Sequence, residues 1–287
     1  MSAGCDVTLV TYENYPDLAP DDQIFRDVLV RRGANVRCAI WSDPDVDWSA
    51  SPLAVIRATW DYPQRYPEFW KWLAHVETRT HLINDPQTVR WNSHKRYLAD
   101  LERSGSRIVP TIFVEAALGF ELADACARRG WDDVVIKPCV GGSSYGARRM
   151  RGNEIATNGV HHLNSLLEFG EAMVQPFLHE TETIGELACI FIDGTFSHAV
   201  RKAPFNSSTV TTSERIYDLT EDDRGFVSDI VEGLERTPAY ARVDIVPTAS
   251  GTVLMELELI EPTLYLGLQP AAAEHLADCV LRTEPAR

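Results

Sequence analysis

Short apolar segments alternate with longer mixed segments in the first part of the chain, which predicts strands that alternate with helices. Strands are expected over residues 7–11, 36–41 and 53–58, and a helix over 22–32 that ends at Gly33. Glycine suits a helix end because it adopts the left-handed backbone conformation without steric cost. Short apolar strands joined by helices favour a parallel sheet. We therefore expect an N-terminal parallel α/β domain over residues 1–85.

The pattern changes at Pro86, which begins a helical stretch that ends at Gly105. Three apolar strands are expected after this stretch, over residues 108–114, 133–137 and 172–177. Glycine and serine cluster between the second and third of these strands, where we expect a turn. The pattern predicts a small central α+β lobe over residues 86–175.

The last part of the chain predicts a second α+β lobe over residues 176–287. Its strands are expected over residues 186–192 and 196–202, its helix over 224–234, and a hairpin over 240–246 and 252–260. An Asp-Gly pair at 193–194 separates the first two strands, and this pair is a strong hairpin signal. A polar loop is expected over residues 206–213.

Composition and charge limit the kind of partner. The chain has 287 residues, of which 45% are hydrophobic, so it can bury a sizeable core. Its 27 basic and 42 acidic residues give a net charge of −15, which opposes binding to nucleic acid or to an anionic membrane. A polyphosphate ligand would need locally concentrated cations or a bridging metal ion.

Targeting and cysteine patterns point to a cytoplasmic, enzyme-sized protein. No apolar run approaches the roughly 20 residues of a membrane helix, and the N-terminus lacks the pattern of a secretory signal. The six cysteines are scattered, with no close pair typical of a zinc or redox motif. We therefore expect buried, unreactive thiols.

The predicted hairpin carries a candidate metal site. Residues two apart on a strand share one face, so Glu256 and Glu258 point the same way. The residues that alternate with them are expected to face the core: Met255, Leu257 and Leu259. Pairing with the preceding strand would bring Arg242 and Asp244 alongside. Gathered carboxylates repel one another, and Mg²⁺ would relieve this repulsion. The alternative is a solvated face of an amphipathic hairpin.

Two lysines are candidates for phosphate contacts. Lys137 ends a buried strand just before a turn of small residues, whose backbone N–H groups can approach phosphate oxygens closely. Lys95 lies in a polar segment of the predicted helix. The alternatives are an ordinary turn and a solvated helical lysine. The apolar strand that ends near Phe177 can offer an adenine ring backbone groups and an apolar floor.

In their order along the chain, these features resemble the ATP-grasp superfamily over roughly residues 86 to 265. The resemblance implies the ATP-grasp fold, with two lobes that sandwich the nucleotide, and ATP and Mg²⁺ as cofactors. It places nucleotide contacts at Lys95, Lys137, Gly142, Ser143, Ser144, Gly146, Gln175, Phe177 and Glu186. It places the metal ligands at Asp244, Glu256 and Glu258, and the catalytic side chains at Arg201, Lys202 and Arg242. Many superfamily members carry asparagine where this chain has Glu258.

Substrate recognition is expected in the N-terminal domain and just after the metal strand. The candidate substrate contacts are Arg57, Thr59, Asp61 and Glu261. For Arg57 and Asp61 the alternative is a salt-bridged loop with packed aromatic side chains. The segments 57–62, 91–98 and 255–262 look like those of the subgroup that contains D-cycloserine synthetase, the O-ureido-D-serine cyclo-ligase.

This resemblance implies a ligase that forms ADP and phosphate. The carboxylate of a small amino acid would be activated as an acyl phosphate, and an amine would capture it to form an amide, in the same molecule or in a second one. A phosphotransferase and an ATP-binding regulatory module stay open as alternatives. A homodimer is the default expectation.

Overall fold

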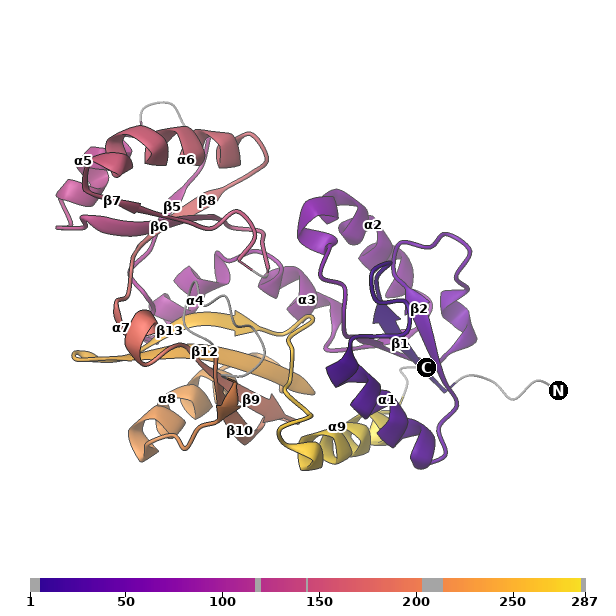
Figure 1. The fold of residues 1–287 in the computed structure, drawn as a ribbon. Helices are drawn as coiled ribbons and strands as arrows, with labels where there is room; N and C mark the ends of the chain where they lie inside the picture. The colour runs from indigo at the N-terminus through magenta and orange to yellow at the C-terminus, as the bar shows by residue number, and fades with distance from the viewer. Residues whose placement is uncertain (1–5, 117–119, 143, 203–213, 285–287) are drawn as a thin grey trace.

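The computed structural model describes residues 6–116, 120–142, 144–202 and 214–284, whose strands form three sheets (Figure 1). The first sheet is parallel, in the order β2-β1-β3-β4. Its strands are β1 Val7–Thr11, β2 Val36–Ile40, β3 Leu53–Ile56 and β4 His81–Ile83. It packs with the helices α1 Pro20–Arg31 and α2 Tyr66–Val76. The predicted N-terminal parallel sheet is therefore confirmed.

The last helix of the chain packs on this first layer. Helix α9, Pro270–Arg282, lies beside α1 (Figure 1), and Leu276 of α9 shares one core with Leu9 of β1 and Phe25 of α1. Each of these three side chains is completely buried. Full burial of a Leu or Phe side chain contributes about 1.5–3 kcal/mol, so α9 stabilises a layer that begins far from it in sequence.

The second sheet is antiparallel, in the order β5-β8-β6-β7. Its strands are β5 Ile112–Val114, β6 Asp133–Pro138, β7 Arg148–Arg151 and β8 Ala172–Pro176. Helices α5 Leu122–Ala127 and α6 Val160–Leu167 cover one face (Figure 1). Because side chains alternate along a strand, Val134 and Ile136 pack under these helices while Val135 and Lys137 point to the opposite face.

The third sheet has the order β11-β10-β9-β12-β13 and is antiparallel throughout. Its strands are β9 Leu187–Ile192, β10 Thr195–Arg201, β11 Arg215–Ile216, β12 Tyr240–Thr248 and β13 Gly251–Glu258. Helix α8, Glu221–Glu232, begins at Thr220, whose hydroxyl accepts a hydrogen bond from the Asp223 N–H. It covers one face of this sheet together with α4, Tyr97–Arg103.

The helical stretch expected from Pro86 is two helices, α3 Pro86–Asn92 and α4, separated by a turn over residues 93–96. The side chain of Asn92 donates to the Leu257 carbonyl and accepts from the Leu259 N–H, both at 2.8 Å. These bonds join the end of α3, just before the turn that carries Lys95, to the end of β13. The domain boundaries at 85/86 and 175/176 stay proposals.

The remaining helical elements are short. They are the turns Trp48–Ala50, Tyr62–Arg65, Gly152–Glu154 and Ile155–Gly159, and α7 Glu180–Thr183. Across the described ranges, no helix combines the length and apolar character needed to cross a bilayer. The predicted polar loop over 206–213 lies outside the described residues.

Candidate active site

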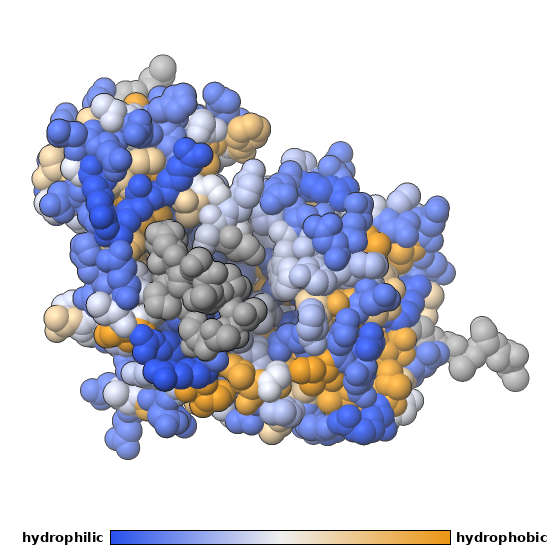
Figure 2. All heavy atoms as spheres, in the orientation of Figure 1, coloured by the Kyte–Doolittle hydropathy of each residue, from blue (hydrophilic) through white to orange (hydrophobic). Residues whose placement is uncertain are grey.

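A cavity of about 640 Å³ lies between the second and third sheets and also touches the N-terminal layer. Figure 2 shows the molecule hollowed between the lobe of α5 and α6 and the rest of the chain. Four cationic side chains and five carboxylates line the cavity: Lys95, Lys137, Lys202, Arg242, Glu186, Glu214, Glu256, Glu258 and Glu261. Carboxylates outnumber cations in this set, so a bound polyphosphate would need additional positive charge.

Strand β13 brings Glu256 and Glu258 to the cavity, as predicted, but a bulge changes its phase. Asp244 pairs with Glu256 and Ile245 pairs with Leu254, so Met255 is the extra residue of a β-bulge. Met255 therefore lines the cavity beside Glu256. The prediction that it faces the core was wrong, because strict alternation does not hold across a bulge.

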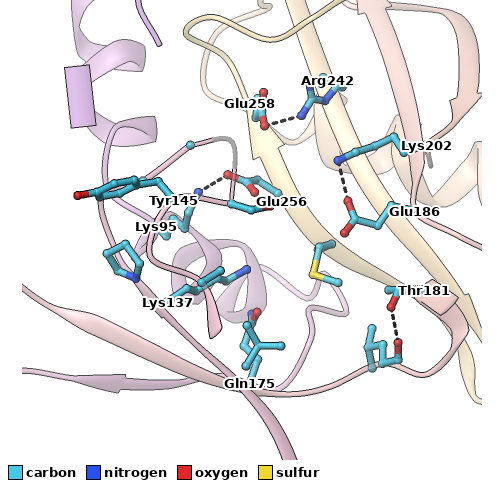
Figure 3. A pocket seen from close by; sticks show the side chains of 18 of the residues that line it. Lys95, Lys137, Tyr145, Gln175, Thr181, Glu186, Lys202, Arg242, Glu256 and Glu258 are labelled. Atoms are coloured by element: carbon cyan, nitrogen blue, oxygen red, sulfur yellow. Dashed lines mark hydrogen bonds and ion pairs between the residues drawn. The ribbon is translucent and has the colours of Figure 1, made fainter. Parts of the chain in front are cut away.

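Lys95 and Lys137 reach the cavity from two different elements and differ in their partners (Figure 3). The Lys95 ammonium forms an ion pair with Glu256. Burial would lower the pKa of Lys95, but the nearby carboxylates, Glu256 first and then Glu258 and Glu261, together outweigh burial and raise that pKa. Lys137 has no ion-pair partner among the described residues, and burial lowers its pKa. Lys137 is thus the cation that an incoming anion can engage without displacing another group.

Asp244 is locked between two cations beneath the cavity. Arg242 donates to its two oxygens from Nε at 2.9 Å and Nη2 at 3.0 Å, and Lys202 Nζ lies 3.0 Å from Oδ2. Burial alone would raise the pKa of Asp244, but these two cations lower it to about 2. Asp244 is not among the residues that line the cavity. Its role as a direct metal ligand stays a prediction.

The segment before β9 positions Glu186 against Lys202, whose Nζ lies 2.6 Å from Glu186 Oε2. Gly185 has a φ of +83°, and a Cβ there would lie 2.9 Å from the Lys202 carbonyl oxygen. Only glycine combines this conformation with such a close approach. The backbone of this segment therefore fixes the spacing between Glu186 and Lys202.

Glu258 and Glu261 lack full compensation for their buried charge. Burial raises the pKa of Glu258 to about 7, and the neighbouring Glu256 and Asp244 add to the rise although Arg242 opposes it. Burial and Glu258 raise the pKa of Glu261 well above its usual value. A divalent cation would relieve this repulsion. The oxygen-only pair Glu256 and Glu258 therefore fits Mg²⁺.

The other end of the cavity is more apolar. It is lined by Val135, Phe177, Leu178 and Met255, with Gln175 beside them. The Phe177 ring is stacked on the guanidinium of Arg149, whose Cζ lies 3.3 Å from the ring centroid. Gln175 Nε2 donates to Thr111 Oγ1 at 2.9 Å, which fixes its amide. This end can accept a flat, weakly polar group such as adenine.

The small-residue turn also contributes to the lining of the cavity. Gly142 and Ser144 line the cavity, and Ser144 has a φ of +58°. Gly146 does not line it; its carbonyl lies 2.8 Å from His162 Nε2, which anchors the end of the turn. Ser143 lies outside the described residues.

The structure does not bring Arg57 to the cavity. Arg57 is completely buried, pairs with Asp22 at 2.7 Å, donates to the Pro262 carbonyl at 2.7 Å, and lies over the Tyr240 ring. This matches the alternative of a salt-bridged, aromatic-packed segment. Thr59 is also completely buried and outside the lining.

Asp61 and Arg201 also lie outside the lining. Asp61 accepts from Trp41 Nε1 at 2.8 Å, and Arg201 Nη2 donates to the Thr183 carbonyl at 2.6 Å. Of the four predicted substrate contacts, only Glu261 lines the cavity.

Several lining residues were not predicted as site residues, among them Trp60, Tyr145, Glu214 and Met255. Trp60 is adjacent in sequence to two predicted substrate contacts, and its Nε1 donates to the Glu261 carbonyl at 3.1 Å. Tyr145 lies inside the small-residue turn. The predicted site residues next to Trp60 and Tyr145 therefore indicated these two positions, whereas Glu214 follows a predicted loop and no pattern in the sequence indicated it.

Known proteins resemble this chain both in sequence and in structure. The family model for the N-terminal domain of D-cycloserine synthetase DcsG matches residues 7–84. The cycloserine biosynthesis protein DcsG of Streptomyces lavendulae is 31% identical over 265 residues, which cover 86% of this chain and 88% of that protein.

Solved structures agree. The crystal structure of D-cycloserine synthetase DcsG superposes with a TM-score of 0.87 at 29% identity, and covers 96% of this chain and 98% of its own. D-alanine–D-alanine ligase from Bacillus anthracis has a TM-score of 0.68 at 15% identity, with 97% and 96% coverage, and so shares the fold. The chain therefore belongs to the D-cycloserine synthetase DcsG family, on the ATP-grasp fold.

Proposed function

We propose that this chain is an ATP-dependent ligase that activates the carboxylate of a small amino acid and joins it to an amine. One observation carries the proposal: Lys95 and Lys137 meet the carboxylates Glu256 and Glu258 across one cavity that also has an apolar end. Lysines at phosphate oxygens, carboxylates for a metal ion and a flat apolar site are the parts that ATP chemistry needs.

The proposed reaction has two steps. A substrate carboxylate oxygen attacks the γ-phosphorus of ATP and ADP leaves, which gives an acyl phosphate. An amine nitrogen then attacks the acyl carbon, phosphate leaves, and the nitrogen loses a proton. The chain needs no covalent nucleophile for this, because its contribution is positioning and charge neutralisation.

The site residues divide this work. Lys137 and Lys95 neutralise phosphate oxygens, and Glu256 and Glu258 would hold Mg²⁺, which when bound supplies the further positive charge. Arg242 holds Glu258 and Asp244 in place. Among the described residues its Nη1 makes a single contact, at 3.5 Å with the Thr263 carbonyl, and we assign this atom to the substrate carboxylate.

For the substrate we propose an O-substituted serine, whose own aminooxy nitrogen would attack the acyl phosphate and close a ring, with loss of phosphate. With O-ureido-D-serine, the carbamoyl group on that nitrogen would then be transferred to water and leave as CO₂ and ammonia, which gives D-cycloserine. This rests on the likeness to DcsG over most of the chain. A homodimer and a cytoplasmic location stay predictions from the sequence.

The test is incubation with Mg²⁺, ATP and a panel of amino acids that includes O-ureido-D-serine, with ADP, phosphate and product mass measured. Hydroxamate formed in the presence of hydroxylamine marks an acyl phosphate. A stable phosphorylated product would instead identify a phosphotransferase, and a product that contains two amino acids an intermolecular ligase. No substrate-dependent ADP across the panel would refute the proposal.

Glu256→Gln is the matched variant for the site. Glutamine can keep the hydrogen bond with Lys95 but removes the anionic oxygen, so turnover should be lost while the urea midpoint changes little. Glu102→Gln, at an exposed position of α4, is the control that should keep full activity. Normal turnover in Glu256→Gln would contradict the metal assignment.

A further inference from the structure

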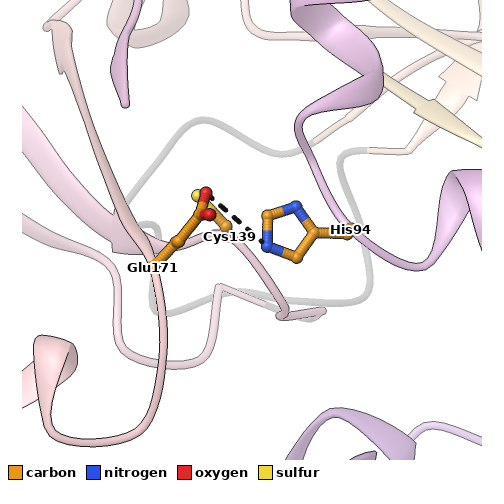
Figure 4. A group of neighbouring side chains, drawn as sticks. All are labelled: His94, Cys139 and Glu171. Atoms are coloured by element: carbon orange, nitrogen blue, oxygen red, sulfur yellow. Dashed lines mark ion pairs between the residues drawn. The ribbon is translucent and has the colours of Figure 1, made fainter. Parts of the chain in front are cut away.

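Three side chains with different donor atoms meet outside the ATP cavity. They are His94 in the turn before α4, Cys139 just after β6, and Glu171 just before β8, and none of them lines the cavity. One ligand atom from each lies within 4.8 Å of the other two. Figure 4 shows the His94 ring and the Glu171 carboxylate directed toward one another, with the Cys139 side chain beside them.

The backbone fixes this arrangement. The Cys139 N–H donates to the Glu171 carbonyl at 2.9 Å, and the Lys95 N–H donates to the Cys139 carbonyl at 2.8 Å. The first bond continues the register of β6 and β8, in which Pro138 pairs with Ala172. The three segments therefore hold their spacing without help from the three side chains.

The geometry points to a Zn²⁺-binding site formed by His94 Nε2, Cys139 Sγ and a Glu171 carboxylate oxygen, with a fourth position open to water. Imidazole, thiolate and carboxylate together suit Zn²⁺, whereas Mg²⁺ avoids sulfur. Ligand atoms around a tetrahedral Zn²⁺ lie roughly 3.5 Å apart. His94 Nε2 and Glu171 Oε2 are 3.8 Å apart, close to that separation.

An ion can reach the site because the His94 and Glu171 side chains are 27% and 26% exposed, while Cys139 closes the buried side. Zn²⁺ would displace the thiol proton to solvent, as metal binding to cysteine requires. Without the ion, burial and then the Glu171 charge raise the pKa of Cys139 to about 12, so the thiol is protonated. The metal must therefore supply the charge that stabilises the thiolate.

Arg96 is the internal competitor of the metal. Its guanidinium forms ion pairs with both Glu171 and Glu115, and its backbone N–H donates to His94 Nδ1 at 3.3 Å. Zn²⁺ at Nε2 places the imidazole proton on Nδ1, so this weak hydrogen bond and the Arg96–Glu171 pair are both lost. Removal of the Arg96 side chain should therefore tighten Zn²⁺ binding by a few-fold, the range of an exposed ion pair.

Bound Zn²⁺ would connect the segments that carry the two phosphate lysines. His94 precedes Lys95 directly, and Cys139 follows Lys137 by two residues. An ion bound to both segments would restrict the motion of the backbone that carries Lys95 and Lys137. The binding itself does not depend on the proposed ligase activity, so each can fail without the other.

The experiment uses the full chain, stripped with a chelator and equilibrated with Zn²⁺ in ATP-free buffer that contains excess Mg²⁺. Retained Zn²⁺ is measured by mass spectrometry after gel filtration, and Co²⁺ substitution reports a thiolate-to-metal charge-transfer band. We expect one equivalent of Zn²⁺ and that band. Cys139→Ala and His94→Gln should each weaken binding by more than ~100-fold, beyond the loss typical of a supporting residue.

The matched controls are Cys126→Ala, at another buried thiol, and His161→Gln, at an exposed histidine, and both should bind as the wild type does. Circular dichroism shows whether each variant is folded. Because His94 is partly exposed, His94→Gln should fold and can test the site even if Cys139→Ala does not fold. Less than stoichiometric Zn²⁺ in the wild type, or an equivalent that persists in both site variants, would overturn the site.

Discussion

Substitution of Arg57 by Met should destabilise the fold and leave substrate affinity unchanged in the folded fraction. Arg57 and Asp22 have side-chain exposures of 0% and 3%, so the change strands a buried carboxylate. Loss of one partner of a buried ion pair costs about 3–5 kcal/mol. The assay is urea unfolding at 25 °C followed by tryptophan fluorescence, because Trp41, Trp48 and Trp72 lie in the core of the same N-terminal layer.

The double variant Arg57→Met with Asp22→Leu separates the ion pair from the other contacts. It removes both charges and leaves mainly the Pro262 carbonyl without its donor, at a cost of about 1–3 kcal/mol. The double variant should therefore be more stable than Arg57→Met by about 2 kcal/mol. Equal instability of the two would refute the ion-pair explanation. An unchanged urea midpoint with a tenfold higher KM for the amino acid would instead restore Arg57 as a substrate contact.

Three further changes test other parts of the structure. Asn92→Ala should lower the free energy of unfolding by about 2–4 kcal/mol, because the Leu257 carbonyl of β13 and the Leu259 N–H just after it lose their partner. Urea titration measures this, and a loss below 1 kcal/mol would contradict it. Lys137→Met should raise the Kd for ATP at least tenfold, as measured by calorimetry, without loss of stability. The reason is that it removes a desolvated cation that has no ion-pair partner among the described residues. Unchanged affinity for ATP would exclude Lys137 from the nucleotide site. Asp133→Asn should cost about 1–3 kcal/mol at pH 7, because hydrogen bonds from Arg149 lower the pKa of Asp133. A lowered carboxyl pKa stabilises the folded state at pH values above the pKa of the unfolded state. The difference in unfolding free energy between Asp133→Asn and wild type should therefore vanish as the pH falls through the folded-state pKa, and a difference that persists in acid would refute this cause.

The sequence was sufficient for the elements whose signals are local. The alternation in β13 placed Glu256 and Glu258 on one face, and the buried strand β6 placed Lys137 at its end next to the small-residue turn. The register of β12 with β13 then follows from the short connection between them, as the pairs Arg242–Glu258 and Asp244–Glu256 confirm.

Features that depend on distant partners were not predictable in the same way. Arg57 follows a buried strand, where ligand contacts are common, but its partners are 35 and 205 residues away and hold it in the core. Met255 reaches the cavity through a bulge that has no sequence signal of its own. His94, Cys139 and Glu171 are brought together only by the pairing of β6 with β8 and by the turn before α4.

The packing of α9 on α1 has a consequence for how the chain acquires its structure during synthesis. The first layer includes residues from position 7 onward, yet its core is closed by a helix that ends at Arg282. A fragment that contains the N-terminal layer alone would leave this apolar surface exposed and prone to self-association. During translation the layer stays incomplete until α9 has left the ribosome, so β1 is made about 260 residues before the helix that encloses it.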